Sequence, residues 1–91
     1  MAYNTITVEN IPTLIVGSNP KRLSLIIEVV GANTIYIGQD TSVTTANGIQ
    51  LVQNAILTED SGSMRMYCGD YYGITASGSS DIRYWERISN A

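Results

Sequence analysis

The sequence predicts a small all-β protein, either an antiparallel β-sandwich or a jelly-roll-like barrel of about eight short strands. Apolar and polar residues alternate with a period of two along several short segments. Turn-forming residues separate these segments at regular spacing, and no segment has the apolar period of an amphipathic helix. The 91 residues contain no linker and no internal repeat, which predicts one domain over residues 1–91.

Turn signals divide the chain into eight or nine predicted strands. Pro12 has no N–H to donate, so the second strand starts only at Thr13 and ends before Gly17-Ser18-Asn19-Pro20. Residues 39–47 are rich in Asp, Thr and Ser and predict a long loop, whereas Glu59–Ser63 predicts a polar turn. The predicted strands cover residues 4–8, 13–16, 22–30, 34–38, 49–52, 55–58, 64–68, 71–76 and 81–87.

The segment 22–30 is the strongest predicted strand because it is richest in β-branched residues. One face is aliphatic and the other is mixed, and a mixed sheet face is often covered by another element or partner. Gly31-Ala32-Asn33 predicts a tight hairpin turn into the strand 34–38, which points Tyr36 outward. The aliphatic face holds Leu23, Leu25, Ile27 and Val29, and the mixed face holds Ser24, Ile26, Glu28 and Val30.

Charge and hydropathy exclude two classes of partner. Eight acidic and five basic residues give a net charge of -3, and the basic residues form no stripe that could neutralise phosphates. We therefore expect no nucleic-acid binding. The longest apolar stretch, residues 23–30, is too short to span a bilayer and the N-terminus shows no secretory signal, so we expect no membrane association.

Residues suited to catalysis are scarce. Histidine is absent, and the lone Cys68 alternates with Met64 and Met66, which predicts a buried structural thiol and no nucleophile. Glu59-Asp60 is the nearest thing to a carboxylate pair but falls in a predicted turn. Asp40, Thr41 and Ser42 offer oxygens for calcium without the spacing of a calcium loop. We expect neither an enzyme nor a bound metal or cofactor.

Aromatic residues near the C-terminus leave two interpretations open. Tyr71, Tyr72 and Trp85 could form an exposed platform that stacks on sugar rings, or they could fill the core and a subunit interface. Arg83 and Trp85 share the face opposite Ile82, which suits an interface anchor, and interface is the favoured interpretation. The predicted interface residues are Ile26, Val30, Tyr36, Tyr71, Arg83 and Trp85.

The order of the motifs from Arg22 to Glu86 resembles a small β-structured virion protein of tailed bacteriophages. An Arg precedes an apolar strand, an Ile-Tyr-Ile-Gly strand follows, and a Ser-Gly-x-x-Asp-Ile-Arg strand closes the chain. Two departures are Gln53-Asn54, where the pattern often has Pro-Gly, and a lengthened segment 64–69. The matching segments are Arg22-Leu23-Ser24-Leu25-Ile26-Ile27, Asn33-Thr34-Ile35-Tyr36-Ile37-Gly38, Val43-Thr44-Thr45-Ala46-Asn47-Gly48-Ile49-Gln50-Leu51 and Ser77-Gly78-Ser79-Ser80-Asp81-Ile82-Arg83-Tyr84-Trp85-Glu86.

The resemblance implies a structural role on a virus particle that is assembled in the host cytoplasm. It implies a capsid decoration (cement) protein, or a head- or tail-associated component, that forms symmetric homo-oligomers, with a trimer favoured, and contacts the major capsid protein. We also expect a chain this short, without an internal disulfide, to gain stability from association with copies of itself or with a larger scaffold. The alternatives are a carbohydrate-binding module and a receptor-contacting tail or fibre component. Residues 1–10 are expected to form either an N-terminal arm onto a neighbour or an ordinary first strand.

Overall fold

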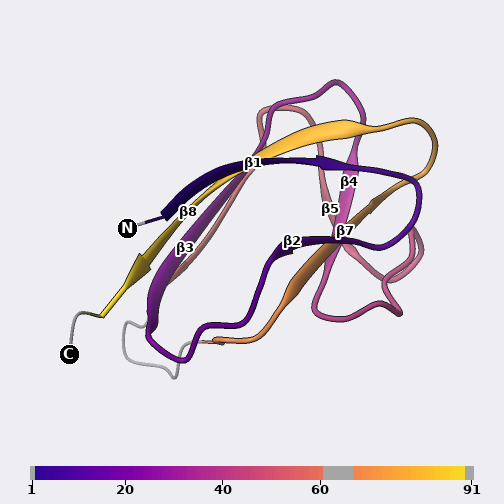
Figure 1. The fold of residues 1–91 in the computed structure, drawn as a ribbon. Helices are drawn as coiled ribbons and strands as arrows, with labels where there is room; N and C mark the ends of the chain where they lie inside the picture. The colour runs from indigo at the N-terminus through magenta and orange to yellow at the C-terminus, as the bar shows by residue number, and fades with distance from the viewer. Residues whose placement is uncertain (1, 61–66, 90–91) are drawn as a thin grey trace.

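Two four-stranded antiparallel sheets pack face to face in the computed structural model, which describes residues 2–60 and 67–89. Sheet A has the strand order β1-β8-β3-β6 and sheet B the order β2-β7-β4-β5 (Figure 1). The strands are β1 (Ala2–Val8), β2 (Thr13–Val16), β3 (Arg22–Val29), β4 (Ile35–Gly38), β5 (Ile49–Leu51), β6 (Ile56–Asp60), β7 (Tyr71–Thr75) and β8 (Ser80–Ile88). The predicted all-β class is confirmed.

The strand order is that of a jelly roll. Each strand pairs with the one equally far from the other end of the chain, so β1 joins β8, β2 joins β7, β3 joins β6 and β4 joins β5. The pairs β8-β3 and β7-β4 then complete the two sheets. Among the described residues, no helix is long and apolar enough to cross a membrane.

Side chains from the inner faces of both sheets form one core. Strand alternation places them there, since every second residue of a strand points to the same face. Aliphatic residues dominate, and Tyr71 adds a ring that is only 2 % exposed. The core consists of Val8, Ile15, Val16, Leu25, Ile27, Val29, Ile35, Ile37, Leu51, Tyr71 and Ile82.

The start of β3 departs from the expected alternation. Leu23 was predicted to face the core but is 39 % exposed, whereas Arg22 is buried. The cause is a register shift between Arg22 and Ser24 where β3 pairs with β8. A bulge of this kind inserts an extra residue and reverses the parity of the strand. Arg22 and Leu25 therefore both face inward although three positions separate them.

The connection after β3 is not the predicted hairpin. Residues 31–33 carry the chain from sheet A to β4 in sheet B, because β3 is already paired on both edges by β8 and β6. Gly31 packs against the start of β8, where its N–H donates to the Asp81 carbonyl at 3.1 Å. A Cβ on Gly31 would lie 2.7 Å from the Asp81 nitrogen, so this crossing requires glycine.

The described residues bear on three other sequence-based expectations. Residues 2–8 pair with β8 along their whole length, as a first strand of the sheet does. Glu59 and Asp60 belong to β6 and not to a turn, because they pair with Leu25 and Ser24. In the predicted strand 64–68, residues 64–66 lie outside the described residues, and Tyr67 and Cys68 are not in a strand.

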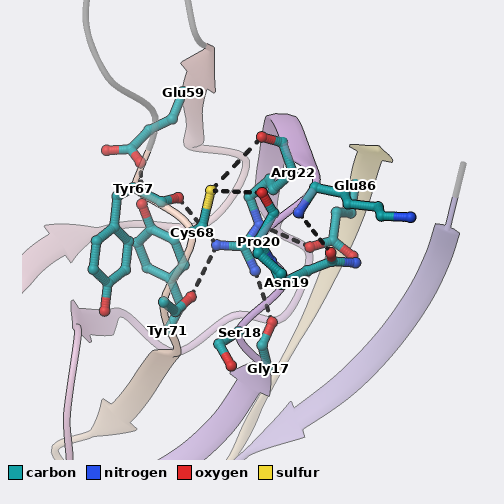
Figure 2. Close-up of polar contacts among 12 residues, drawn as sticks. Gly17, Ser18, Asn19, Pro20, Arg22, Glu59, Tyr67, Cys68, Tyr71 and Glu86 are labelled. Carbon is teal, nitrogen blue, oxygen red and sulfur yellow. Dashed lines mark hydrogen bonds and ion pairs between the residues drawn. The ribbon is translucent and has the colours of Figure 1, made fainter. Parts of the chain in front are cut away.

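Buried Arg22 joins four separate segments at one end of the sandwich (Figure 2). Its Nε donates to Glu86 Oε2 on β8 at 2.7 Å, in an ion pair whose side chains are 0 % and 9 % exposed. One terminal nitrogen donates to the Tyr67 and Gly69 carbonyls at 3.2 and 2.9 Å, and the other to the Gly17 carbonyl at 2.7 Å. The guanidinium also lies 5.7 Å from the centroid of the Tyr71 ring.

Arginine suits this position because its planar fork directs several donors at once. The carbonyls of residues 17, 67 and 69 have no strand partner there, and the guanidinium satisfies them while neutralising Glu86. A buried polar group without a partner costs about 1–3 kcal/mol. Arg22 therefore fixes how the β2–β3 connection and the segment 67–70 meet β3 and β8.

We predict that Arg22→Leu lowers the free energy of unfolding by about 3–5 kcal/mol, because it leaves the Glu86 carboxylate buried without its cation. Urea unfolding followed by Trp85 fluorescence measures the change. Lys21→Met alters the exposed neighbour and should stay within about 0.5 kcal/mol of the native protein. Arg22→Leu combined with Glu86→Leu should recover part of the loss. An Arg22→Leu protein as stable as Lys21→Met would contradict this role.

We also predict that Gly31→Ala destabilises the fold by about 1–3 kcal/mol, because the new Cβ overlaps the backbone of β8. Gly17→Ala is the matched control, since a Cβ there meets nothing within 4 Å. Thermal unfolding of the two variants side by side tests the crossing. Equal melting temperatures for both would show that the close approach does not matter.

Candidate protein-binding surface

The outer face of sheet A presents side chains that alternate with the core residues of β1, β8, β3 and β6. The register places Arg83 of β8 between Thr5 of β1 and Glu28 of β3. Glu28 in turn lies opposite Ile56 of β6. In the next row Trp85 lies opposite Ile26, and Ile26 opposite Thr58. We call this set the outer face of sheet A: Thr5, Ser24, Ile26, Glu28, Ile56, Thr58, Asp81, Arg83, Trp85 and Arg87.

The centre of this face is apolar and exposed. Trp85 is 54 % exposed, Ile56 58 % and Ile26 37 %. A hollow of about 240 Å³ opens between them, lined also by Glu28, Arg83 and Tyr84. A second hollow, of about 350 Å³, adjoins it on the β1 side of Trp85. Exposed Trp and Arg around an apolar centre are the composition of protein-binding surfaces.

The structure brings together three of the six predicted interface residues. Ile26, Arg83 and Trp85 lie on the outer face of sheet A, as their strand parity predicts. Val30 is half-buried just after β3. The other two predicted residues, Tyr36 and Tyr71, belong to sheet B.

Tyr71 is the clear correction among these residues. Its ring is buried in the core, so it is not part of the exposed outer face of either sheet. The alternative of a sugar platform formed by Tyr71, Tyr72 and Trp85 together is therefore wrong, because Trp85 lies on the outside of the other sheet. The interpretation that part of this set fills the core holds for Tyr71. The reason is parity: β7 directs Tyr71, Gly73 and Thr75 inward, and the strand alternation alone does not say which set faces the core.

Ile56 and Glu28, which line the hollow at the centre of the outer face, were missed as interface candidates. Ile56 follows from the register, because it stands opposite Glu28 once β6 pairs with β3. Glu28 was recognised as part of a mixed face but was not connected with Arg83. The pairing of β3 with β8 joins distant parts of the chain and carries no local signal in the sequence.

The outer face of sheet B differs in its chemistry. Half-buried Tyr36 and Tyr72 alternate with core residues of β4 and β7, and exposed Leu14 lies opposite Tyr72. The outward-facing residues in the described strands of this sheet are all uncharged: Leu14, Tyr36, Gln50, Tyr72 and Ile74. The charged and the uncharged faces therefore lie on opposite sides of the sandwich.

A third hollow, of about 390 Å³, lies at the open edge between the sheets and is lined by Asp40 and Glu59 among others. The hydroxyl of Tyr71 donates to the Glu59 carboxylate, and Ser42 donates its N–H and its hydroxyl to Asp40 Oδ1. The Ser42 bonds lower the pKa of Asp40. Burial of Tyr71, helped by Glu59, raises the pKa of the Tyr71 hydroxyl well above its ordinary value.

This edge hollow supplies two carboxylates, which an acid-catalysed reaction would need. Both carboxylates already accept hydrogen bonds from the protein, and the raised pKa keeps Tyr71 neutral. Within residues 2–60 and 67–89, no three His, Cys, Asp or Glu side chains come together as a metal site. Asp40 and Ser42 form a hydrogen-bonded loop.

Cys68 is half-buried, at a loop position rather than on a strand face. Its thiol lies 3.7 Å from the Arg22 carbonyl and 3.9 Å from the Pro20 carbonyl (Figure 2). Its own carbonyl accepts the Asn19 N–H at 2.8 Å. The predicted neighbours Met64 and Met66 lie outside the described residues. Cys68 thus helps to hold the β2–β3 connection.

Comparison with known proteins found no matching family model, no matching curated protein and no matching solved structure.

We predict that Tyr71→Phe makes stability less sensitive to alkaline pH. Because folding raises the pKa of Tyr71, its contribution is complete below the unfolded pKa of about 10 and falls as pH rises above it. Tyr71→Phe should cost about 1 kcal/mol at pH 7, from the lost bond to Glu59, and then lose less between pH 9 and pH 11 than the native protein. Urea unfolding at each pH measures both effects. Equal alkaline losses would contradict the assignment.

Proposed function

We propose that this chain is a non-enzymatic structural protein of a bacteriophage particle, most specifically a capsid decoration (cement) protein. The observation that carries the proposal is the outer face of sheet A, where Ile26, Arg83 and Trp85 form an exposed apolar and cationic surface. A sheet face of this composition is suited to binding another protein surface.

Two further features support the proposal. The motif order from Arg22 to Glu86 resembles small virion proteins of tailed phages. The jelly-roll strand order is also one that viral capsid proteins use, among several other classes. A shared fold is an argument by analogy and does not by itself assign a function. The exposed outer face of sheet A supports a role in binding another protein.

The proposed mechanism is stabilisation by many small contacts. Copies of the chain would contact one another and the major capsid protein, on a particle assembled in the host cytoplasm. A lattice places many weak sites at high effective concentration, so each contact can be modest while the assembled layer is stable. The two chemically different outer faces give one chain separate surfaces for two kinds of neighbour.

One observation favours a second candidate function. Trp85 is exposed and borders two hollows that also contain polar side chains, such as Glu28 and Thr5. An aromatic ring beside hydrogen-bonding groups is a suitable site for a sugar, as expected of a carbohydrate-binding module or a receptor-contacting tail or fibre component. A glycan array probed with the native protein separates the two candidates, because a decoration protein needs no glycan.

We predict that the purified protein binds assembled phage heads that lack it and does not bind dissociated capsid subunits. Trp85→Ala should weaken head binding at least about tenfold, the effect of losing one central anchor of about 1.4 kcal/mol or more. Co-sedimentation with heads over a range of protein concentrations measures the affinity.

Ile49→Ala is the matched control, since Ile49 is comparably exposed but lies on β5 at the edge of sheet B. It should bind heads as the native protein does. A native protein with no affinity for heads would overturn the proposed function. Equal weakening of head binding by both variants would show that the outer face of sheet A is not the head-binding surface.

A further inference from the structure

We propose that the outer face of sheet A binds the same face of a second copy of the chain. The twofold axis would run parallel to β8 and β3, midway between them and in the plane of contact. The inference deepens the proposed function by naming the partner of this face, and its experiment uses the free protein, so either proposal can fail alone. The proposed pairing of two copies rests on the register of β8 against β3.

The register makes this face complementary to itself. A twofold axis between the two strands places each residue of β8 over the residue of β3 that lies beside it in the same sheet. Arg83 stands opposite Glu28, so Arg83 of each copy would face Glu28 of the other. Two ion pairs would form by symmetry. Trp85 stands opposite Ile26, so the same axis brings two apolar pairs together.

The facing pairs remain in reach of each other when the twist of the two sheets is taken into account. Packed sheets cross at about 30°. The backbone positions of the two facing pairs, Arg83 with Glu28 and Trp85 with Ile26, lie within about 4 Å of the point on the axis midway between the pairs. This distance combines half the strand spacing with half the rise of two residues. A rotation of about 30° therefore displaces the facing positions by about 2 Å, which long side chains such as Arg83 can follow.

The shape of the face agrees with this arrangement. The hollow of about 240 Å³ lies beside Ile26 and Ile56, where the axis would deliver Trp85 of the second copy. Each indole would enter the hollow of the other molecule, with Arg83 and Glu28 at its border. Aromatic and arginine anchors seated in a pocket carry most of the affinity of protein interfaces.

The size of the face predicts a reversible association. Four strands spaced at about 4.8 Å, over seven residues rising about 3.3 Å each, span roughly 440 Å². A standard stable interface buries about 800 Å² per partner. We therefore expect a concentration-dependent dimer in free solution that becomes stable where a particle holds the copies close together.

The complementarity is isologous, because the same residues serve both copies, and this requires a twofold relation. A trimer, which the resemblance to phage proteins favours, would need a different surface. A capsid protein would need its own acidic, basic and apolar groups at matching positions, whereas a second copy of the chain always has them. The charge pairing of Arg83 and Glu28 is what singles out the second copy as the occupant.

A charge-swap mixing experiment tests the pairing across the interface. Arg83→Glu makes the centre of the face acidic, and Glu28→Arg makes it basic, so each variant alone repels its own kind. In a 1:1 mixture, the new carboxylate of Arg83→Glu faces the new guanidinium of Glu28→Arg, and the unchanged Glu28 of the first variant faces the unchanged Arg83 of the second. Pairing within one chain cannot produce this rescue, because each chain carries two like charges.

Sedimentation velocity at increasing concentration is the measurement, with circular dichroism to verify folding. We expect the native protein to dimerise reversibly, each variant to be monomeric at concentrations where the native protein pairs, and the mixture to regain dimers. If a charge variant fails to fold, Ile26→Glu should abolish dimers while Ile49→Glu, on β5, leaves them intact. A native protein monomeric up to about 1 mM, a native trimer, a mixture without dimers, or dimers that survive Ile26→Glu would overturn the inference.

Discussion

Arg22 is the residue on which the arrangement of one end of the sandwich depends. Its guanidinium neutralises Glu86 of β8 and satisfies carbonyls of the β2–β3 connection and of the segment 67–70. Glu86 follows Ile82 and Tyr84 on the inward parity of β8, so a carboxylate enters the core and needs a cation. The bulge at Leu23 delivers that cation while leaving Leu25, Ile27 and Val29 inside.

The pairing of β3 with β8 also determines which side chains the outside of sheet A presents. With Arg22 and the aliphatic residues directed inward, Ile26 and Glu28 are directed outward, against Trp85 and Arg83 of β8. The buried ion pair and the exposed face are therefore two consequences of one register. The buried Arg22 at the start of β3 and the proposed interface therefore depend on the same pairing of β3 with β8.

Local patterns in the sequence predicted the strands well, because alternation and turn residues act over a few positions. They could not predict how strands pair, since β1 with β8 and β3 with β8 depend on contacts between distant parts of the chain. The crossing at Gly31 was predicted as a hairpin because Gly-Ala-Asn is also a turn signal. The difference lies in the neighbours of β3, which occupy both its edges.

The candidate surface was predicted only in part for the same reason. Parity placed Ile26, Arg83 and Trp85 outward but could not tell that β3 and β8 are neighbours. Tyr71 was misplaced because β7 begins with two adjacent tyrosines, so either alternation directs one of them inward and the other outward. The packing of the core decides that Tyr71 is the buried one. Arg22 was assigned to the strand 22–30 but not to the core, since no local pattern shows a buried arginine.

The central claim is that the outer face of sheet A is a protein-binding surface. Cryo-electron microscopy of the proposed phage particle would test it most directly, because it shows which surfaces are covered. We expect the face around Trp85, Ile26 and Arg83 to be covered by protein, with the Trp85 ring buried in the contact. A particle in which this face points into solvent, or in which the chain is absent, would contradict the account.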